Sequence, residues 1–320
     1  MFLILGINLV FGIISKQESR RKTAVGIWED TPLKRFQTRL SYAFYGKKAG
    51  ALLRCGAFLS ASITVSALLT VIVVMFFKGV PVLLRSPQLI FGQYSFGSHR
   101  ITLLPAIVTT LYAVALSLLI AVPIGVMTAI YLQEYAKRSH RSVRLIRTAI
   151  NILSGVPSIV YGLFGMITFV KLLGGSASIL AGSLTVSMML LPVIVRSVEE
   201  SLMTVPQGLR EGSHALGAGK LRTVWKIVLP SALSGICSAV ILSMSRVISE
   251  SAPFLYTMGS VLSDIPKRLS DSGATLAVAL YQLSGEGWYL EEAYGATVVL
   301  ILMALLLNLL AEWLMTRRKA

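Results

Sequence analysis

Six stretches of this chain are long and apolar enough to cross a lipid bilayer as helices, and this feature limits the possible folds more than any other. A transmembrane helix needs about 20 mainly apolar residues. The predicted spans are Cys55–Phe77, Leu103–Leu132, Ala149–Leu173, Ile179–Val195, Leu229–Ser249 and Gly295–Met315. Of the 320 residues, 55% are hydrophobic and only 14% are charged, which excludes a disordered chain and disfavours a soluble enzyme. The sequence therefore predicts an all-α membrane protein.

The positive charges orient these six transmembrane helices. Of the 30 Lys and Arg residues, 23 lie in segments on one side of the predicted membrane and five in the alternate loops. The 23 lie in residues 15–54, 137–147, 196–226 and 317–319. Because cytoplasmic loops carry an excess of Lys and Arg, we expect both termini to be cytoplasmic. The net charge of +16 then reflects orientation in the membrane and does not indicate nucleic-acid binding.

The predicted domain organisation is one membrane domain with two basic ends. Its parts are a cytoplasmic N-terminal segment 1–54, a transmembrane domain 55–315 with a cytoplasmic loop 196–228 and an outer loop 251–294, and a tail 316–320. The outer loop contains an apolar run, Ala274–Leu283, that is too short to cross. An interfacial helix, a partner-facing lid and an ordinary folded loop all fit this run.

No residue pattern in the chain is typical of a catalytic or cofactor site. The two cysteines and three histidines are scattered, and there is no glycine-rich phosphate loop. The predicted spans hold no paired carboxylates, no Ser-His pair and no metal-ligand cluster. We therefore expect no cofactor and no catalysis by this chain, and an intramembrane enzyme or a stand-alone channel is the less favoured alternative to a transport subunit.

The cytoplasmic loop 196–228 is predicted to contain a short helix. Thr204 is expected to cap it, with Gln207 three residues later, and the helix should continue to about Leu216. Leu209 and Leu216 are seven residues apart and share a face, which suits docking into a groove on a soluble partner. An ordinary interhelical loop is the alternative interpretation.

Glycines and a proline predict how this short helix ends. Gly217 and Gly219 are both expected to permit a left-handed turn. A second basic stretch, Lys220–Val228, follows, and Pro230 is expected to start the fifth span.

The same loop resembles the EAA loop of ABC-importer permeases. The resemblance lies in Glu211, Gly217 and Ile227-Val228-Leu229-Pro230, with the spacing E-x5-G-x9-I-x-L-P. It departs at Gly212 and Ser213, where that family typically has two alanines. The resemblance implies docking into a cleft of an ATP-binding subunit. The implied coupling residues are Leu209, Arg210, Glu211, Ala215, Leu216 and Gly217.

Three further stretches resemble phosphate-importer permeases. They are Ser154–Gly165, Leu191–Glu200 and Ser245–Pro253. Within the last, Ala252-Pro253 resembles the PstA-type subunit more than its PstC-type partner. The resemblance implies a type I ABC-importer permease (MetI-like) fold that imports inorganic phosphate by alternating access.

This resemblance also implies an assembly in a bacterial plasma membrane. The implied partners are two copies of an ATP-binding subunit, which would hydrolyse the ATP, a PstC-type second permease and an extracytoplasmic phosphate-binding protein. A permease of the same fold for molybdate, sulfate or an amino acid is the alternative.

Arg246 is the charge that stands out within the predicted spans. It lies 16 residues after Pro230, or about 24 Å along a helix, which is still inside a roughly 30 Å apolar layer. Glu250 is one turn further on and is expected to pair with it. A structural pair and an anion-binding pair fit this position equally well. The resemblance to phosphate permeases favours substrate-pathway residues.

Arg196 is a second pathway candidate, and it is expected to close the fourth span. Glu199 and Glu200 lie three and four residues later and are interpreted as its partners. A flanking cytoplasmic arginine is the alternative.

Small residues in the third predicted span are expected to form one packing stripe. They are Gly155, Ser158, Gly162 and Gly165. Such a stripe lets a neighbouring helix approach closely, and Pro157 is expected to kink the span.

Overall fold

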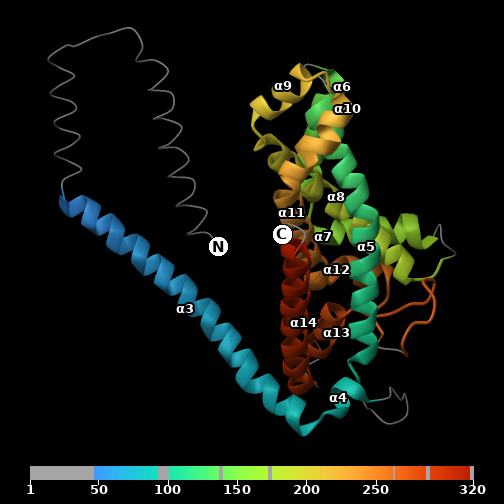
Figure 1. Cartoon of the computed structure of the whole chain (residues 1–320). Coiled ribbons are helices and arrows are strands. Elements are labelled where there is room, and N and C mark those ends of the chain that lie inside the picture. Colours follow the sequence, from blue (N-terminus) through green and yellow to red (C-terminus); the bar gives the residue numbers. More distant parts are fainter. Residues whose placement is uncertain are drawn as a thin grey trace. The chain divides into compact units, whose positions relative to one another are not determined.

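The computed structural model (Figure 1) describes residues 47–92, 101–136, 140–171, 175–261, 264–285 and 289–317. Every regular element in these residues is helical. The chain divides into two units, Met1–Val71 and Ile72–Ala320, and the packing described below is that of the second unit. Most of the predicted segment 1–54 and the last three residues of the tail 316–320 lie outside the described residues.

Among the described residues, five helices are long and apolar enough to cross a membrane. They are α3 (Lys47–Arg85), α5 (Leu104–Ile130) continued by η1 (Tyr131–Tyr135), α8 (Ile179–Met203), the run of α10 (Lys220–Thr223), η3 (Val224–Val228) and α11 (Leu229–Ser249), and α14 (Leu290–Arg317). A sixth span is possible if α6 (Arg141–Ser154) and α7 (Ser158–Gly165) with η2 (Met166–Val170) are counted together. The short helices are α4 (Gln88–Phe91), α9 (Gln207–Ala215), α12 (Ala252–Thr257) and α13 (Leu276–Gly285). The predicted all-α membrane fold is confirmed.

The third predicted span, Ala149–Leu173, is wrong as a single helix. Proline has no backbone N–H and disfavours helical backbone at the preceding residue, and the chain breaks just before Pro157. The two arms α6 and α7 differ in direction by 103°. They also differ in composition, because α6 carries three arginines and α7 none. The expected kink is therefore a sharp turn between a basic arm and an apolar arm.

The predicted stripe of small residues is divided by this break. Gly155 belongs to the turn and has no neighbouring atom nearer than 3.5 Å to the position of a Cβ. Gly162 packs against the backbone of α12, and Gly165 packs against Thr185 of α8. Close packing is confirmed for the two glycines of α7, but a single stripe that includes Gly155 is wrong.

Helices α5 and α8 pack together through small and polar residues at the centre of the bundle. The Ser187 hydroxyl donates to the Ser117 carbonyl at 3.1 Å, and the Ser117 hydroxyl donates to the Ser183 carbonyl at 3.3 Å. Gly125 allows Ile194 to approach the α5 backbone. Small residues and interhelical hydrogen bonds are the usual means of helix association in an apolar solvent, where the hydrophobic effect between helices is absent.

The segment predicted as an outer loop, 251–294, contributes to the core. Within its apolar run Ala274–Leu283, the side chain of Leu276 is fully buried. The Leu276 N–H donates to the Thr110 hydroxyl of α5 at 2.9 Å. The run Ala274–Leu283 therefore packs against the bundle through this face.

The N-terminus of α8 is closed by the turn that precedes α13. The first N–H groups of a helix have no partner within it, and here the Ile179 N–H donates to the Asp271 carbonyl at 3.0 Å. The Asp271 carboxylate accepts the N–H groups of Arg268 and Lys267 at 2.8 and 2.9 Å. These bonds, first that of Arg268, hold the pKa of Asp271 below its ordinary value.

The helix α11 has the bounds predicted for the fifth span, Leu229–Ser249, with Pro230 at its start as expected, but helical backbone also precedes it. The chain is helical without interruption from Lys220 to Ser249. A proline lacks the N–H for the bond to residue i−4, and its ring crowds that carbonyl. The wider π-turn η3 lies directly before the proline and accommodates both the missing hydrogen bond and the bulk of the ring. The result is a continuous helix of 30 residues.

The contact of Gly165 with Thr185 gives a stability prediction. We expect Gly165→Ala to lower the free energy of unfolding by about 1–3 kcal/mol, because the added methyl group would overlap the Thr185 side chain. Gly155→Ala is the matched control and should have little effect. Thermal unfolding of the purified protein in detergent measures both, and equal midpoints for the two variants would contradict the packing described.

Candidate functional site

The cytoplasmic loop folds as predicted over most of its length, but two of its expected caps are wrong. Thr204 does not cap α9, since its hydroxyl donates to the Ser201 carbonyl at the end of α8 and Pro206 precedes α9. Gly217 has a φ of +80°, so the left-handed turn is confirmed there. Gly219 has a φ of −69° and leads into α10, so a left-handed turn there is wrong.

The outward side of this loop is apolar with a basic border. Leu216 is 90% exposed and Leu209 is 46% exposed, and the side chains of Glu211 and Ala215 are also exposed. Beside Leu216 lies an open groove of about 340 Å³. Its lining residues are Ser213, Leu216, Gly217, Ala218, Arg222, Lys226 and Ile227. A helix of this kind suits a groove on a soluble partner.

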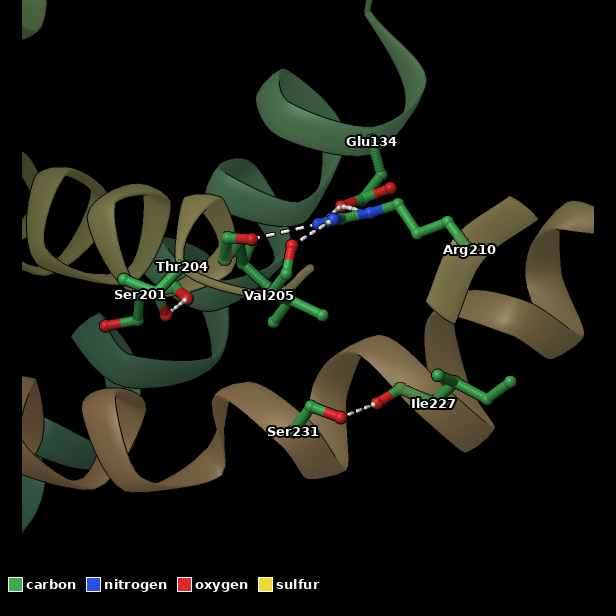
Figure 2. Close-up of polar contacts among 8 residues, drawn as sticks. Glu134, Ser201, Thr204, Val205, Arg210, Ile227 and Ser231 are labelled. Carbon is green, nitrogen blue, oxygen red and sulfur yellow. Dashed lines mark hydrogen bonds and ion pairs between the residues drawn. The ribbon is translucent and has the colours of Figure 1, made fainter. Parts of the chain in front are cut away.

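Arg210 points inward, away from this surface (Figure 2). Its guanidinium binds the carboxylate of Glu134 in η1 with a shortest distance of 2.8 Å, and the side chains are 16% and 10% exposed. It also donates to the carbonyl oxygens of Leu202 and Val205 at 2.9 and 2.6 Å. The sequence spacing alone did not indicate Glu134, which lies 76 residues away.

Ser213 provides a second internal contact of α9. Its buried hydroxyl lies 2.9 Å from the Thr223 hydroxyl of α10. The departure from alanine at this position therefore adds a hydrogen bond between α9 and the helix that continues into the membrane. Gly212 has nothing within 4 Å of the position of a Cβ.

In the membrane domain, the predicted pairing of Arg246 with Glu250 is confirmed. The Arg246 Nε lies 3.5 Å from the Glu250 Oε1, and their side chains are 37% and 15% exposed. The neighbouring Ser245 hydroxyl donates to Asn308 of α14 at 2.9 Å. Asn308 lies about 27 Å from the outer end of α14 and about 14 Å from the other end. The pair therefore lies away from both ends of α14, and its arginine is partly exposed.

Arg196 does not close α8, which continues to Met203. Its Nε binds Glu200 at 3.2 Å, and both side chains are more than half exposed, so the predicted pairing with Glu200 is confirmed. Glu199 binds Arg147 of α6 at 3.0 Å. That contact joins two helices, and sequence spacing within one helix could not reveal it.

A hydroxyl-rich cavity of about 350 Å³ lies between the cytoplasmic halves of α8 and α11. The hydroxyl groups belong to Ser197, Ser201, Thr204, Ser231, Ser234 and Ser238. Gly235 faces Ser201 across this contact, which fixes the register of the two antiparallel helices. In that register Arg246 lies about 9 Å further toward the outer side than Arg196. Ser231, Ser238 and Arg246 lie on one side of α11, since they are 7 and 8 residues apart.

These contacts form three features: an exposed helix surface, a hydroxyl-rich cavity and an ion pair. Among the described residues no group of three or more His, Cys, Asp or Glu could hold a metal ion. The cytoplasmic surface of α9, the hydroxyl-rich cavity and the Arg246–Glu250 pair are connected by one continuous helix, Lys220–Ser249. Together they can bind a partner at one end and an anion at the other.

Comparison with known proteins gives the family. Residues 121–317 match the family model described as binding-protein-dependent transport system inner membrane component. The chain is 34% identical over 220 residues to the probable ABC transporter permease protein YqgI of Bacillus subtilis, covering 64% of this chain and 74% of the relative. It is 36% identical over 219 residues to the phosphate transport system permease protein PstA 1 of Mycobacterium tuberculosis, covering 67% and 70%.

Two solved transporters share the fold. A chain of the inward-facing MetNI methionine ABC transporter matches with a TM-score of 0.54 and 21% identity, covering 67% of this chain and 92% of the other. A chain of a bacterial alginate ABC transporter matches with a TM-score of 0.52 and 16% identity, covering 81% and 96%. The expected MetI-like ABC-importer permease fold is confirmed.

The different backbones of Gly217 and Gly219 give a test of the loop geometry. We expect Gly217→Ala to destabilise the α9–α10 turn by about 1–2 kcal/mol, the cost of a left-handed backbone at a residue with a Cβ. Neither glycine has a neighbour within 4 Å, so Gly219→Ala serves as the control and should be nearly neutral. Limited proteolysis of the purified protein, followed at sites in residues 204–220, measures the opening of the turn. Equal cleavage rates would show that the left-handed backbone is unimportant.

Proposed function

The chain belongs to the family of inner membrane components of binding-protein-dependent transport systems, and we propose that it is the PstA-type permease subunit of an ATP-driven importer of inorganic phosphate. The family and the fold support an ABC-importer permease that works with an ATPase and a substrate-binding protein. Phosphate as the substrate is supported by relatives that are named phosphate transport permeases. The chain is a multi-pass membrane protein, and the family implies the plasma membrane of a bacterium.

The Arg246–Glu250 pair is the observation that carries this proposal. A charged side chain inside a bilayer costs at least a few kcal/mol and normally faces the protein interior or a water-filled path. This pair lies within the apolar span α11 and its capping residue, and Arg246 is 37% exposed. The side of α11 that carries Arg246 must therefore face a polar path or a second chain in the assembled transporter.

The chemistry of this pair suits transient binding of phosphate. A guanidinium donates two parallel hydrogen bonds that fit a phosphate oxyanion. Glu250 neutralises Arg246 when no anion is present, and at 3.5 Å the contact is longer than a strong charge-assisted hydrogen bond. A phosphate group can therefore replace the carboxylate as the partner of Arg246, and the carboxylate can return when the anion leaves.

Arg196 and the hydroxyl-rich cavity extend this path toward the cytoplasm in our proposal. Arg196 is a second positive charge for the anion, and Glu200 is its partner in the empty path. A PstC-type permease would supply the facing wall, and an extracytoplasmic phosphate-binding protein would deliver the substrate to the outer side. Closure of two ATPase subunits would then change the side to which the path opens.

The exposed surface of α9 is the proposed docking site for the ATPase. Leu209 and Leu216 supply the apolar contact, with Glu211, Ala215 and Gly217 around them. Burial of a leucine side chain contributes about 1.5–3 kcal/mol, so Leu216, which is 90% exposed in this chain, can contribute a large part of the affinity. Arg210, which points inward, would support this surface without touching the partner.

Replacement of Arg246 tests the phosphate path. We expect Arg246→Gln to abolish uptake of labelled phosphate, because the anion loses its charged partner, while the transporter still assembles. Arg144→Gln, at an exposed position of α6, is the matched control and should transport normally. Uptake is measured in cells whose own copy of this chain is deleted. Normal uptake by Arg246→Gln would reduce Arg246 to a structural residue.

The same cells distinguish phosphate from other substrates. We expect high-affinity phosphate uptake to disappear when this chain is deleted, and excess sulfate or molybdate not to compete for the restored activity. Unchanged phosphate uptake in the deletion strain, or competition by these other oxyanions, would favour a permease of the same fold for another substrate.

Replacement of Leu216 tests the docking surface. We expect Leu216→Asp to weaken ATPase binding by at least about tenfold, because it removes apolar contact and places a charge in the interface. Co-purification of the ATPase subunit from detergent measures this loss. Leu290→Asp, at the outer end of α14 and half exposed, is the control. Equal recovery of the ATPase with both variants would exclude Leu216 from the docking surface.

A further inference from the structure

The Arg210 side chain joins three segments of the chain that are far apart in sequence. Its guanidinium contacts Glu134 in η1, and it reaches the carbonyls of Leu202 and Val205 at the end of α8. Its own backbone lies in α9. One side chain therefore connects the short cytoplasmic helix to the ends of two membrane helices (Figure 2).

The geometry of this contact requires an arginine. Nε and Nη2 both donate to the Glu134 Oε1, at 3.3 and 2.8 Å, while Nη1 and Nη2 donate to the two carbonyls. Four hydrogen bonds thus use the planar fork of five N–H donors, which an ammonium group cannot reproduce. The Leu202 carbonyl lies in the last turn of α8 and also accepts the N–H groups of Thr204 and Val205, and a cation is favourable beside a helix C-terminus.

Glu134 lies at a point where α5 changes its helical geometry. The π-turn η1 continues α5 directly, and such turns are frequent at functional sites. In the α5–α8 contact, the serine hydroxyls and Gly125 hold the two helices closely together. A displacement of η1 would therefore also move the closely packed helices α5 and α8.

Other contacts of the loop connect it to α11 and, through α10, to η1. The Ser213–Thr223 hydrogen bond connects α9 to α10, and α10 continues into α11. The ammonium of Lys220 in α10 lies 5.2 Å from the ring centre of Tyr135 in η1. Among the described contacts of α9, the Arg210–Glu134 pair is the polar link to α5, and the Ser213 hydroxyl is the link to α11.

We propose that Glu134 is a positioning residue for transport, which acts through Arg210 to make α5 follow the movements of α9. This inference rests on the proposed function, because it takes α9 as the helix that the ATPase displaces. Without the ion pair, α9 would still bind the ATPase through its outward side and would still move α11. The end of α5 would lose its direct ion pair with α9 and keep the weaker Lys220–Tyr135 contact with α10, so the two walls of the path would move together less closely.

The test uses the complete transporter, with both permease chains and the ATPase, reconstituted into liposomes and supplied with the binding protein. The variants are Glu134→Gln, which removes the charge at similar volume, and Arg210→Lys, which keeps the charge and removes the fork. Arg144→Gln is the matched control, since it removes a charge at an exposed position of α6. The readouts are phosphate transported per ATP hydrolysed and the hydrogen exchange of residues 131–136 with and without an ATP analogue.

We expect Glu134→Gln and Arg210→Lys to retain the ATPase and to hydrolyse ATP. The amount of phosphate transported per ATP should fall by at least about fivefold, the size expected when coupling between two sites is lost. The nucleotide should change exchange at residues 131–136 in the parent transporter and in Arg144→Gln, and much less in Glu134→Gln and Arg210→Lys. If Glu134→Gln does not assemble, Arg210→Lys alone decides.

Three outcomes separate the possible interpretations. Parental transport per ATP together with nucleotide-dependent exchange in both variants would overturn the inference. Loss of ATPase binding in both variants would also overturn it, since Glu134 would then act in docking. The third outcome separates this inference from the substrate proposal. If the parent transporter moves no phosphate, the substrate proposal fails. If Glu134→Gln nevertheless abolishes the nucleotide-dependent change in exchange at residues 131–136, the role of Glu134 stands.

Discussion

An ionised side chain in or near an apolar bilayer must have a partner, and the four ion pairs that the described residues form organise this structure. The most buried pair, Arg210–Glu134, joins the cytoplasmic loop to α5. Arg147–Glu199 joins α6 to α8. The other two pairs, Arg196–Glu200 and Arg246–Glu250, lie within single helices and are more exposed. The pairs between helices therefore connect distant segments of the fold, and the pairs within helices are those that we propose for the anion path.

The sequence predicted those features that depend on neighbours along the chain. Hydropathy gave the bounds of α11, and a spacing of four residues gave the Arg246–Glu250 pair. The left-handed turn at Gly217 followed from the lack of a Cβ. Similarity to known permeases gave the fold, because motif residues carry information that hydropathy lacks. The same local signals were wrong for Gly219, which has an ordinary negative φ, and for Thr204, whose hydroxyl bonds back to α8. Each residue suits more than one backbone geometry, and the packing of the whole loop determines which one forms.

Features that depend on distant parts of the chain could not be predicted in this way. Glu134 binds an arginine 76 residues away, and no periodicity within one helix relates two such positions. The burial of α13 depends on the space between α5 and α14, which the short apolar run itself does not reveal. The break before Pro157 was expected as a kink, but the angle of 103° depends on the packing of α7 against α12 and α8. The division of roles between the ion pairs is therefore information that only the folded chain provides.

The π-turn η3 lies near one end of the 30-residue helix Lys220–Ser249, where a locally wider turn can act as a hinge. From Val228 to Arg246 the helix extends about 27 Å, so a tilt of about 7° around η3 would move the guanidinium by about 3 Å. A displacement of that size is comparable to the length of a hydrogen bond. A small rotation of α10 can therefore make or break the contacts of the Arg246 guanidinium. The size of that displacement grows with the length of helix between η3 and Arg246.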